Sequence, residues 1–183
     1  MARLIHLNGP PGIGKSALAK RYVADHPGVL NCDIDVLRTL IGGWEDDFAG
    51  AGALIRPSAL AMIGAYLAAG NDVVLPQMLF SPEELVRFSG CATAVGAEYV
   101  ERFVMDSEDS SVARFGRRGA DEPGDVWHGQ VRTIVAANGG EAALRRCHAA
   151  LTTLLLERPE AVVIESVEGS VEETYEALCA SLD

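Results

Sequence analysis

Positive charge is scarce in this sequence. It has 15 lysines and arginines against 26 aspartates and glutamates, which gives a formal net charge of −11 at pH 7. A protein that coats nucleic acid through a wide surface needs that surface to be basic. The composition therefore argues against this class of protein, although a small local basic site is still compatible with it.

Cysteines and long apolar runs are scarce as well. The four cysteines lie far apart and form no C-x-x-C pair, which argues against a zinc site or a disulfide framework and predicts reduced thiols. We expect no segment long and apolar enough to span a membrane. The apolar run after Arg3 is interrupted by His6 and Asn8, which is not the pattern of a signal peptide. We therefore expect a soluble cytoplasmic protein without a membrane partner.

The clearest pattern in the chain is a glycine-rich stretch between an apolar segment and a helix-forming segment. It fits the P-loop pattern G-x-x-x-x-G-K-[ST] at every fixed position, and it reads Gly9-Pro10-Pro11-Gly12-Ile13-Gly14-Lys15-Ser16. In this pattern backbone N–H groups point at phosphate oxygens, Lys15 reaches the β- and γ-phosphates, and the Ser16 hydroxyl ligates Mg²⁺. The N-terminal end of the helix that begins here adds positive potential. We therefore predict a nucleoside triphosphate site over residues 9–17, with Ala17 included.

Short apolar segments alternate with helix-forming segments along the chain. We predict strands at 3–7, 29–32, 72–75, 98–105 and 161–164. We predict helices at 15–24, 36–41, 57–69, from 81 to about 95, at 107–118, 126–137 and 141–156, and from 170 onward, with a mobile surface loop at 42–53. Such alternation predicts one α/β domain over residues 1–183, with a five-stranded parallel sheet and helices on both faces.

Two carboxylates and an arginine follow the second predicted strand, in the pattern Asp33-x-Asp35-x-x-Arg38. The C-terminal ends of parallel strands are where ligands bind in open α/β sheets. Phosphoryl transfer uses a carboxylate to orient or deprotonate the acceptor hydroxyl. One carboxylate is therefore a candidate for that role, and the other for holding a Mg²⁺-bound water. The alternative is that Asp33 and Asp35 form only a turn and a helix cap.

Arg114, Arg117 and Arg118 form a local basic cluster in this acidic chain. Arginines bind phosphate oxygens in pairs and stabilise the charge of a transferring phosphoryl group. On a helix, Arg114 and Arg118 share a face. The alternative is a solvated helix end, where positive charge is favourable in any case.

Two motifs of other P-loop proteins are missing. There is no N-K-x-D guanine-specificity motif, and no apolar strand ends in a clear Walker-B aspartate, since the third predicted strand ends in Pro76-Gln77 and the fifth in Glu165. These absences argue against a GTPase and against a motor-type ATPase.

Together these motifs resemble the P-loop small kinases, which include chloramphenicol phosphotransferase, shikimate and gluconate kinases and zeta toxins. The segment from His26 to Arg38 is most similar to the phage-type 5′-polynucleotide kinases. The similarity is specific over about residues 3–41 and loose beyond.

The resemblance implies a role for several residues. It implies ATP and Mg²⁺ as cofactors, Asp35 as the general base, Arg38 as a substrate contact, and Asp33 as a residue that holds Mg²⁺ through water. It also implies a short helical lid at about 107–125, whose Arg114 and Arg118 close over ATP and act in catalysis. A loop at 167–170, which includes Gly169, is implied to flank the adenine. Gln77 stands where these families often carry Asp-Thr, so it is assigned to the substrate site.

These observations predict an ATP-dependent kinase that phosphorylates a hydroxyl of a small molecule, for which an antibiotic or another natural product is one candidate. A polynucleotide 5′-kinase and a nucleotide-binding regulatory ATPase without an acceptor are the alternatives. The sequence leaves the oligomeric state open. Outside these motifs, His6 is expected to be a core histidine, and Trp44 and Trp127 either line the acceptor pocket or pack in the core or lid.

Overall fold

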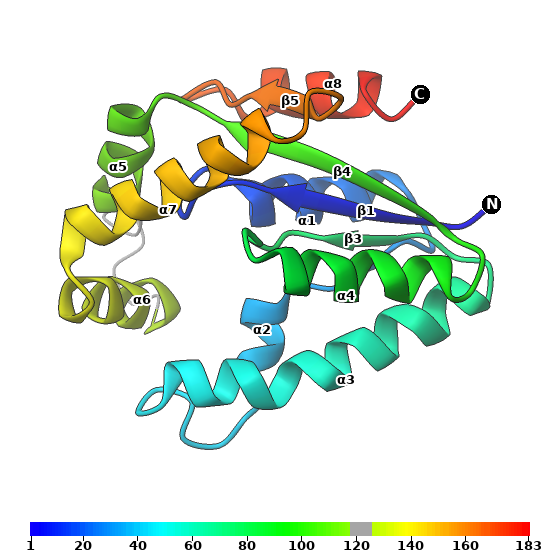
Figure 1. Ribbon diagram of the computed structural model, residues 1–183, viewed down its shortest axis with the longest axis horizontal. Helices are drawn as coiled ribbons and strands as arrows, with labels where there is room; N and C mark the ends of the chain where they lie inside the picture. The colour runs from blue at the N-terminus through cyan, green and yellow to red at the C-terminus, as the bar shows by residue number, and fades with distance from the viewer. Residues whose placement is uncertain (118–125) are drawn as a thin grey trace.

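The computed structural model describes residues 1–117 and 126–183, and in it five strands form one parallel sheet in the order β2–β3–β1–β4–β5 (Figure 1). The strands are β1 Arg3–Asn8, β2 Leu30–Asn31, β3 Val73–Leu75, β4 Glu98–Met105 and β5 Val162–Glu165. The central strand β1 pairs with β3 and β4, so that Leu4 lies between Val73 and Tyr99. The predicted α/β fold with a five-stranded parallel sheet is confirmed.

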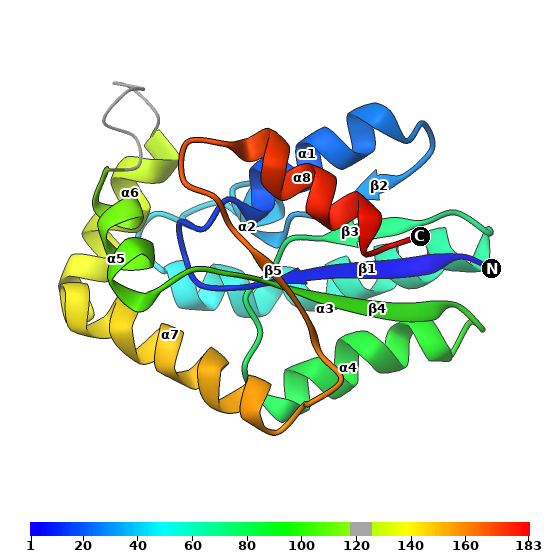
Figure 2. The ribbon, with the colours of Figure 1, turned by 90° about the horizontal axis from the view of Figure 1, so that it is seen from above.

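Helices cover both faces of this sheet. They are α1 Lys15–Asp25, α2 Ile34–Arg38, α3 Phe48–Ala68, α4 Pro82–Thr93, α5 Glu108–Arg117, α6 Val126–Ala137, α7 Gly140–Leu156 and α8 Val171–Ala180. Successive side chains of a strand point to opposite faces. In β1, Leu4 therefore packs with α3, α4 and α7, whereas Ile5 and Leu7 pack with α1 and α8. Figure 2 shows α8 beside α1 on the second of these faces.

The structure contradicts the predicted loop at 42–53 from residue 48 onward, since only residues 42–47 are non-helical, and it contradicts the predicted helix start at Pro57. Helix α3 already begins at Phe48, and the Asp47 side chain accepts a hydrogen bond from Gly50 N (2.8 Å) at its N-terminus. Pro57 lies inside the helix. Because of the glycines in this segment, the sequence did not reveal its buried stripe. The stripe consists of Ala51, Ile55, Ala59, Ile63 and Leu67. Burial of that stripe against the sheet outweighs the low helix propensity of glycine and proline.

By length and composition α3 also contradicts the expectation that no segment could span a membrane. Among the described residues it is the one helix long and apolar enough to cross a membrane, with 21 residues and a mean hydropathy of 1.3. The core helix of a soluble protein passes the same test. Here Ile55, Ala59 and Ile63 pack in the core, and Arg56 forms an ion pair with Glu84 of α4 (2.9 Å).

Candidate active site

The glycine-rich loop joins β1 to α1 at the C-terminal edge of the sheet, as its pattern predicts. Lys15 begins α1, and its Nζ donates hydrogen bonds to the carbonyl oxygens of Gly9 and Pro10 (both 2.8 Å). The side chain therefore lies folded along the loop. Ser16 follows it on the first turn of α1.

Two glycines of this loop are required by their surroundings. A Cβ on Gly9 would lie 2.3 Å from the carbonyl oxygen of Val104 on β4. Gly12 has φ +82°, and a Cβ there would lie 3.1 Å from Cα of Phe115 on α5. Glycine alone accepts both the positive φ and the close approach. The loop thus packs directly against β4 and α5.

A cavity of about 430 Å³ extends from the P-loop across the edge of the sheet. Lys15 and Ser16 line it at the P-loop, and Asp35, Arg38 and Gln77 line it as well. The structure therefore brings together the predicted phosphate and acceptor residues. Most of the remaining lining is apolar, and it includes Phe48, Met78, Phe80, Phe115, Trp127, Val131, Ile134, Val135 and Leu144.

Asp33 and Asp35 have different surroundings. Asp33 is buried and caps α2, since its Oδ1 accepts a hydrogen bond from the backbone N–H of Asp35 (3.0 Å). The side chain of Asp35 is 41% exposed, and its Oδ1 lies 3.1 Å from Nη1 of Arg38. The cap foreseen as the alternative is thus present at Asp33, whereas Asp35 is an accessible carboxylate at the cavity.

Arg38 is a buried cation at the base of this cavity. Its guanidinium carbon lies 3.7 Å from the ring centroid of Phe48. Its Nε is buried without a hydrogen-bond acceptor among the described residues, whereas Nη1 forms the ion pair with Asp35. Burial lowers the pKa of Arg38, and the charge of Asp35 partly offsets this effect. Gly52 of α3 packs on the same guanidinium, since a Cβ there would lie 2.9 Å from Nη2.

The residues present fit a magnesium ion held mainly by the nucleotide. In the part of the chain that the structure describes, no three His, Cys, Asp or Glu side chains gather as a metal site. Mg²⁺ in kinases keeps several waters and binds one or two protein groups together with phosphate oxygens. Ser16 at the head of α1 supplies one such group, and Asp33 remains the predicted contact through water.

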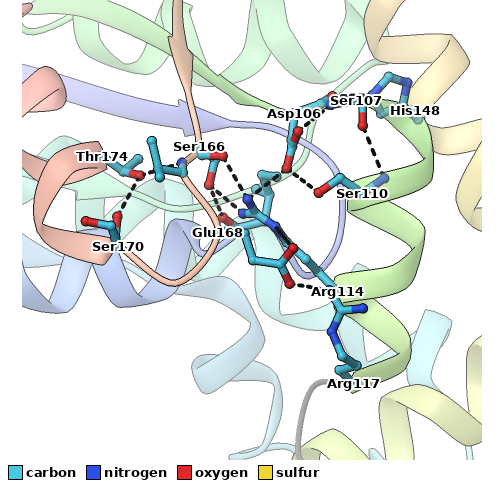
Figure 3. Close-up of polar contacts among 12 residues, drawn as sticks. Asp106, Ser107, Ser110, Arg114, Arg117, His148, Ser166, Glu168, Ser170 and Thr174 are labelled. Carbon is cyan, nitrogen blue, oxygen red and sulfur yellow. Dashed lines mark hydrogen bonds and ion pairs between the residues drawn. The ribbon is translucent and has the colours of Figure 1, made fainter.

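Arg114 lies in a different place from Lys15 and Asp35, two of the other predicted catalytic residues. It lines a second cavity of about 180 Å³, formed by the P-loop and by the segment after β5 that includes Gly169. Its Nη1 donates to Ser166 Oγ and its Nη2 to Ser166 O (both 2.8 Å), and Nη2 lies 2.7 Å from Asp106 Oδ2 (Figure 3). Arg117 pairs with Glu168 on the same segment. Arg118 and the rest of the predicted lid to residue 125 lie outside the described residues.

Sequence reasoning missed the role of Asn8, the last residue of β1. Its amide is fully buried and makes hydrogen bonds at both ends. Nδ2 donates to Leu79 O (2.7 Å) and Glu101 Oε1 (3.1 Å), and Oδ1 accepts from Gly9 N (2.9 Å) and Leu79 N (3.0 Å). Asn8 thus joins the P-loop to the segment after β3. The only sequence signal is a polar residue at the end of an apolar strand.

His6 is the core histidine that the sequence predicts. Its ring is fully buried, with Nδ1 2.7 Å from the Tyr99 hydroxyl and Nε2 2.7 Å from the carbonyl oxygen of Gln77. Since a carbonyl oxygen only accepts, Nε2 carries the proton. His6 thereby holds the backbone of Gln77, whose side-chain Oε1 is buried without a hydrogen-bond donor among the described residues.

Aromatic side chains link α6 to the start of α3 across the cavity from the P-loop. Trp127 lies 5.4 Å from Trp44 and 5.7 Å from Phe48, measured between ring centroids. Gln130 Nε2 donates to Glu45 O (2.6 Å). Trp127 therefore lines the cavity, and Trp44 packs against it.

Comparison with known proteins agrees with this geometry. Residues 4–138 match the family model described as an AAA domain. No curated protein matches the chain. Among solved structures, the tunicamycin resistance protein of Deinococcus radiodurans is similar at 18% identity and a TM-score of 0.60, over 100% of this chain and 96% of that one. A gluconokinase from Sinorhizobium meliloti 1021 is similar at 20% identity and a TM-score of 0.61, over 98% and 92%. These identities show a shared fold, and the predicted resemblance to the P-loop kinases is confirmed at that level.

Proposed function

Since the chain belongs to the AAA domain family and has the fold of the P-loop kinases, we propose that it is an ATP-dependent kinase for a hydroxyl group of a small molecule. The observation that carries this proposal is the cavity in which Lys15 and Ser16 of the P-loop meet Asp35 and Arg38. A phosphate site and an accessible carboxylate in one cavity are the parts that phosphoryl transfer requires.

In the proposed reaction Lys15 and the loop amides bind the phosphates of ATP. Ser16 would hold Mg²⁺ together with the nucleotide, and the ion would supply positive charge against the phosphates. Asp35 accepts the proton of the acceptor hydroxyl while the hydroxyl oxygen forms a bond to the γ-phosphorus, and the bond from that phosphorus to the bridging oxygen of ADP breaks. The ion pair with Arg38 limits the rotation of the Asp35 carboxylate.

The shape and lining of the cavity favour a small acceptor with an apolar body. Its volume of about 430 Å³ lies in the range of ligand pockets, and Phe48, Phe80 and Trp127 supply large apolar surface. A polynucleotide would need a wide basic surface, which a chain of net charge −11 argues against. One similar structure is named for tunicamycin resistance and the other as a gluconokinase, and neither activity is assigned to this chain. The four free cysteines fit a reducing compartment, so we place the activity in the cytoplasm.

The proposal is tested by transfer of labelled γ-phosphate from ATP. One reaction contains a 5′-hydroxyl oligonucleotide and another a pool of hydroxylated metabolites and antibiotics. Label in the pool supports the proposal, and fractionation then identifies the acceptor. Label on the oligonucleotide would favour a polynucleotide kinase. Free phosphate at the same rate in both reactions would favour a regulatory ATPase.

Asp35→Asn tests the mechanism with the acceptor so identified. We expect kcat to fall by roughly 10²–10⁴-fold, the usual contribution of a general base, with ATP affinity nearly unchanged. Asp46→Asn is the matched control, since Asp46 is exposed and does not line the cavity. Near-normal turnover of Asp35→Asn would contradict the assignment of the base.

A further inference from the structure

We propose that His6 is a positioning residue for the acceptor side of the site, and that it acts by fixing the direction of the Gln77 side chain at the cavity. The proposal rests on the proposed kinase function, in which this cavity takes the acceptor. It starts from the place where the pairing of two strands stops. The backbones of β1 and β3 pair as far as His6 and Leu75, and beyond Leu75 side chains of β1 hold the segment instead.

Pro76 ends the backbone pairing after Leu75. Proline has no backbone N–H and donates no hydrogen bond to a neighbouring strand. The N–H of Gln77 then turns back to the carbonyl oxygen of Leu75 (3.1 Å), which leaves the carbonyl oxygen of Gln77 for another partner. That partner is His6, whose Nε2 donates to it over 2.7 Å. A side chain of β1 therefore continues the contact that the two backbones no longer make.

The ring of His6 is held from its other side as well. Its Nδ1 lies 2.7 Å from the Tyr99 hydroxyl and 3.3 Å from Oε1 of Glu101, both on β4. Burial and the charge of Glu101 raise the pKa of the Tyr99 hydroxyl, so this hydroxyl keeps the proton that it can donate to Nδ1. Glu101 in turn pairs with Arg158, just after α7. The buried ring cannot turn without breaking one of these contacts, so the backbone of Gln77 is held in one place.

The side-chain amide of Gln77 is the group that this contact directs. Gln77 is 8% exposed and lines the cavity together with Asp35 and Arg38. Its Oε1 is buried without a hydrogen-bond donor among the described residues. A buried acceptor without a partner is unfavourable, and a ligand that donates to it removes this cost. The amide therefore fits an acceptor with a hydroxyl or N–H group in addition to the hydroxyl that is phosphorylated.

NMR of protein with ¹⁵N-labelled glutamine side chains tests the positioning without any acceptor. Gln77 and Gln130 are the only glutamines of the chain. His6→Gln and His6→Asn form a matched pair, because glutamine can place an N–H where Nε2 stands, whereas the shorter asparagine cannot. We expect the Gln77 amide signals to stay in place in His6→Gln. In His6→Asn they should shift and broaden toward those of a freely rotating amide, while the Gln130 signals do not move.

Steady-state kinetics with the acceptor that labelled-phosphate transfer identifies tests the effect on recognition. We expect His6→Asn to raise the KM for the acceptor by roughly threefold to tenfold, the scale of one neutral hydrogen bond, with the KM for ATP nearly unchanged. His6→Gln should restore the KM for the acceptor. Gln77→Leu should show a similar loss. The double variant His6→Asn/Gln77→Leu should lose no more than Gln77→Leu alone, because His6 acts through that side chain.

His148→Asn is the matched control, because His148 also donates from Nε2 to a backbone carbonyl oxygen, that of Asp106 (2.9 Å), and does not line the cavity. Gln77 signals that are the same in His6→Asn as in the unmodified protein would overturn the proposal. An equal loss in His6→Asn and His6→Gln would overturn it as well, because it indicates a packing role only.

Tyr99→Phe decides the matter if His6→Asn does not fold. It removes the hydroxyl that orients the His6 ring, so it should move the same Gln77 signals, and unchanged signals would overturn the proposal. The NMR comparison needs neither ATP nor an acceptor. Its outcome is therefore separate from that of the kinase proposal, and a failure of one is distinguished from a failure of the other.

Discussion

Asn8 joins the two halves of the candidate site, and its replacement by alanine is the sharpest test of how the site is held together. The amide makes four hydrogen bonds, to Gly9 N, to both backbone groups of Leu79 and to Glu101. All four lie in the interior, where Asn8 is 0% exposed. Alanine would therefore leave three backbone groups buried without a partner.

The expected loss follows from the cost of such groups. A buried donor or acceptor without a partner costs about 1–3 kcal/mol. For three backbone groups the free energy of unfolding should fall by roughly 3–9 kcal/mol, a large part of the ~5–15 kcal/mol that stabilises a domain. Asn8→Asp keeps the shape and the two accepted hydrogen bonds, but it places a carboxylate beside the Leu79 carbonyl and Glu101, so we expect a similar loss.

Urea unfolding followed by circular dichroism measures this difference. Asn71→Ala is the control, since Asn71 is exposed in the turn after α3 and substitution there should change stability by less than about 0.5 kcal/mol. A loss below about 1 kcal/mol for Asn8→Ala would refute the reasoning, because it would mean that the freed groups find water or other partners. In that case Asn8 would not be what holds Leu79 against the P-loop.

Two further predictions concern the surroundings of the site. In Gly52→Ala the new Cβ would lie 2.9 Å from Nη2 of Arg38, the mobile end of that side chain. We expect thermal stability to be kept, since alanine is up to about 1 kcal/mol more favourable than glycine in a helix. We expect kcat/KM for the acceptor to fall by roughly tenfold, because Arg38 shifts. An unchanged kcat/KM would count against a role for Arg38. For Glu101, burial favours the neutral carboxyl, but hydrogen bonds from His6 and Asn8 and the charge of Arg158 outweigh it and lower the pKa. A lowered pKa stabilises the fold above the unfolded value of about 4.3, and this contribution is lost as the pH falls through the folded value. In Glu101→Gln the urea midpoint should therefore fall less steeply with decreasing pH below about pH 4.3. A midpoint that falls as steeply as in the unmodified protein would contradict this account.

Local patterns predicted most of the fold. The five strands lie close to their predicted ranges because apolar residues mark each of them, as buried parallel strands require. The longest, β4, also contains Glu98, Glu101 and Arg102. The start of α3 was missed because its first turns contain Gly50 and Gly52, whose low helix propensity is overcome only by burial of residues such as Ile55. A single sequence window does not contain the sheet that buries this face.

By itself the sequence determined the phosphate loop and the place of Asp35 directly after a strand, whereas the structure showed that Asp35 is accessible. The spacing of Gly9, Gly12, Gly14 and Lys15 is a local backbone property, and Asp35 follows its strand within a few residues. Only the tertiary structure decided which distant residues form the hydrogen bonds around this site. Arg114 meets Ser166 from 52 positions away, and Asn8 meets Leu79 from 71 positions away. Hydrogen bonds between residues so far apart depend on how the strands are ordered in the sheet, and no spacing along the chain encodes them.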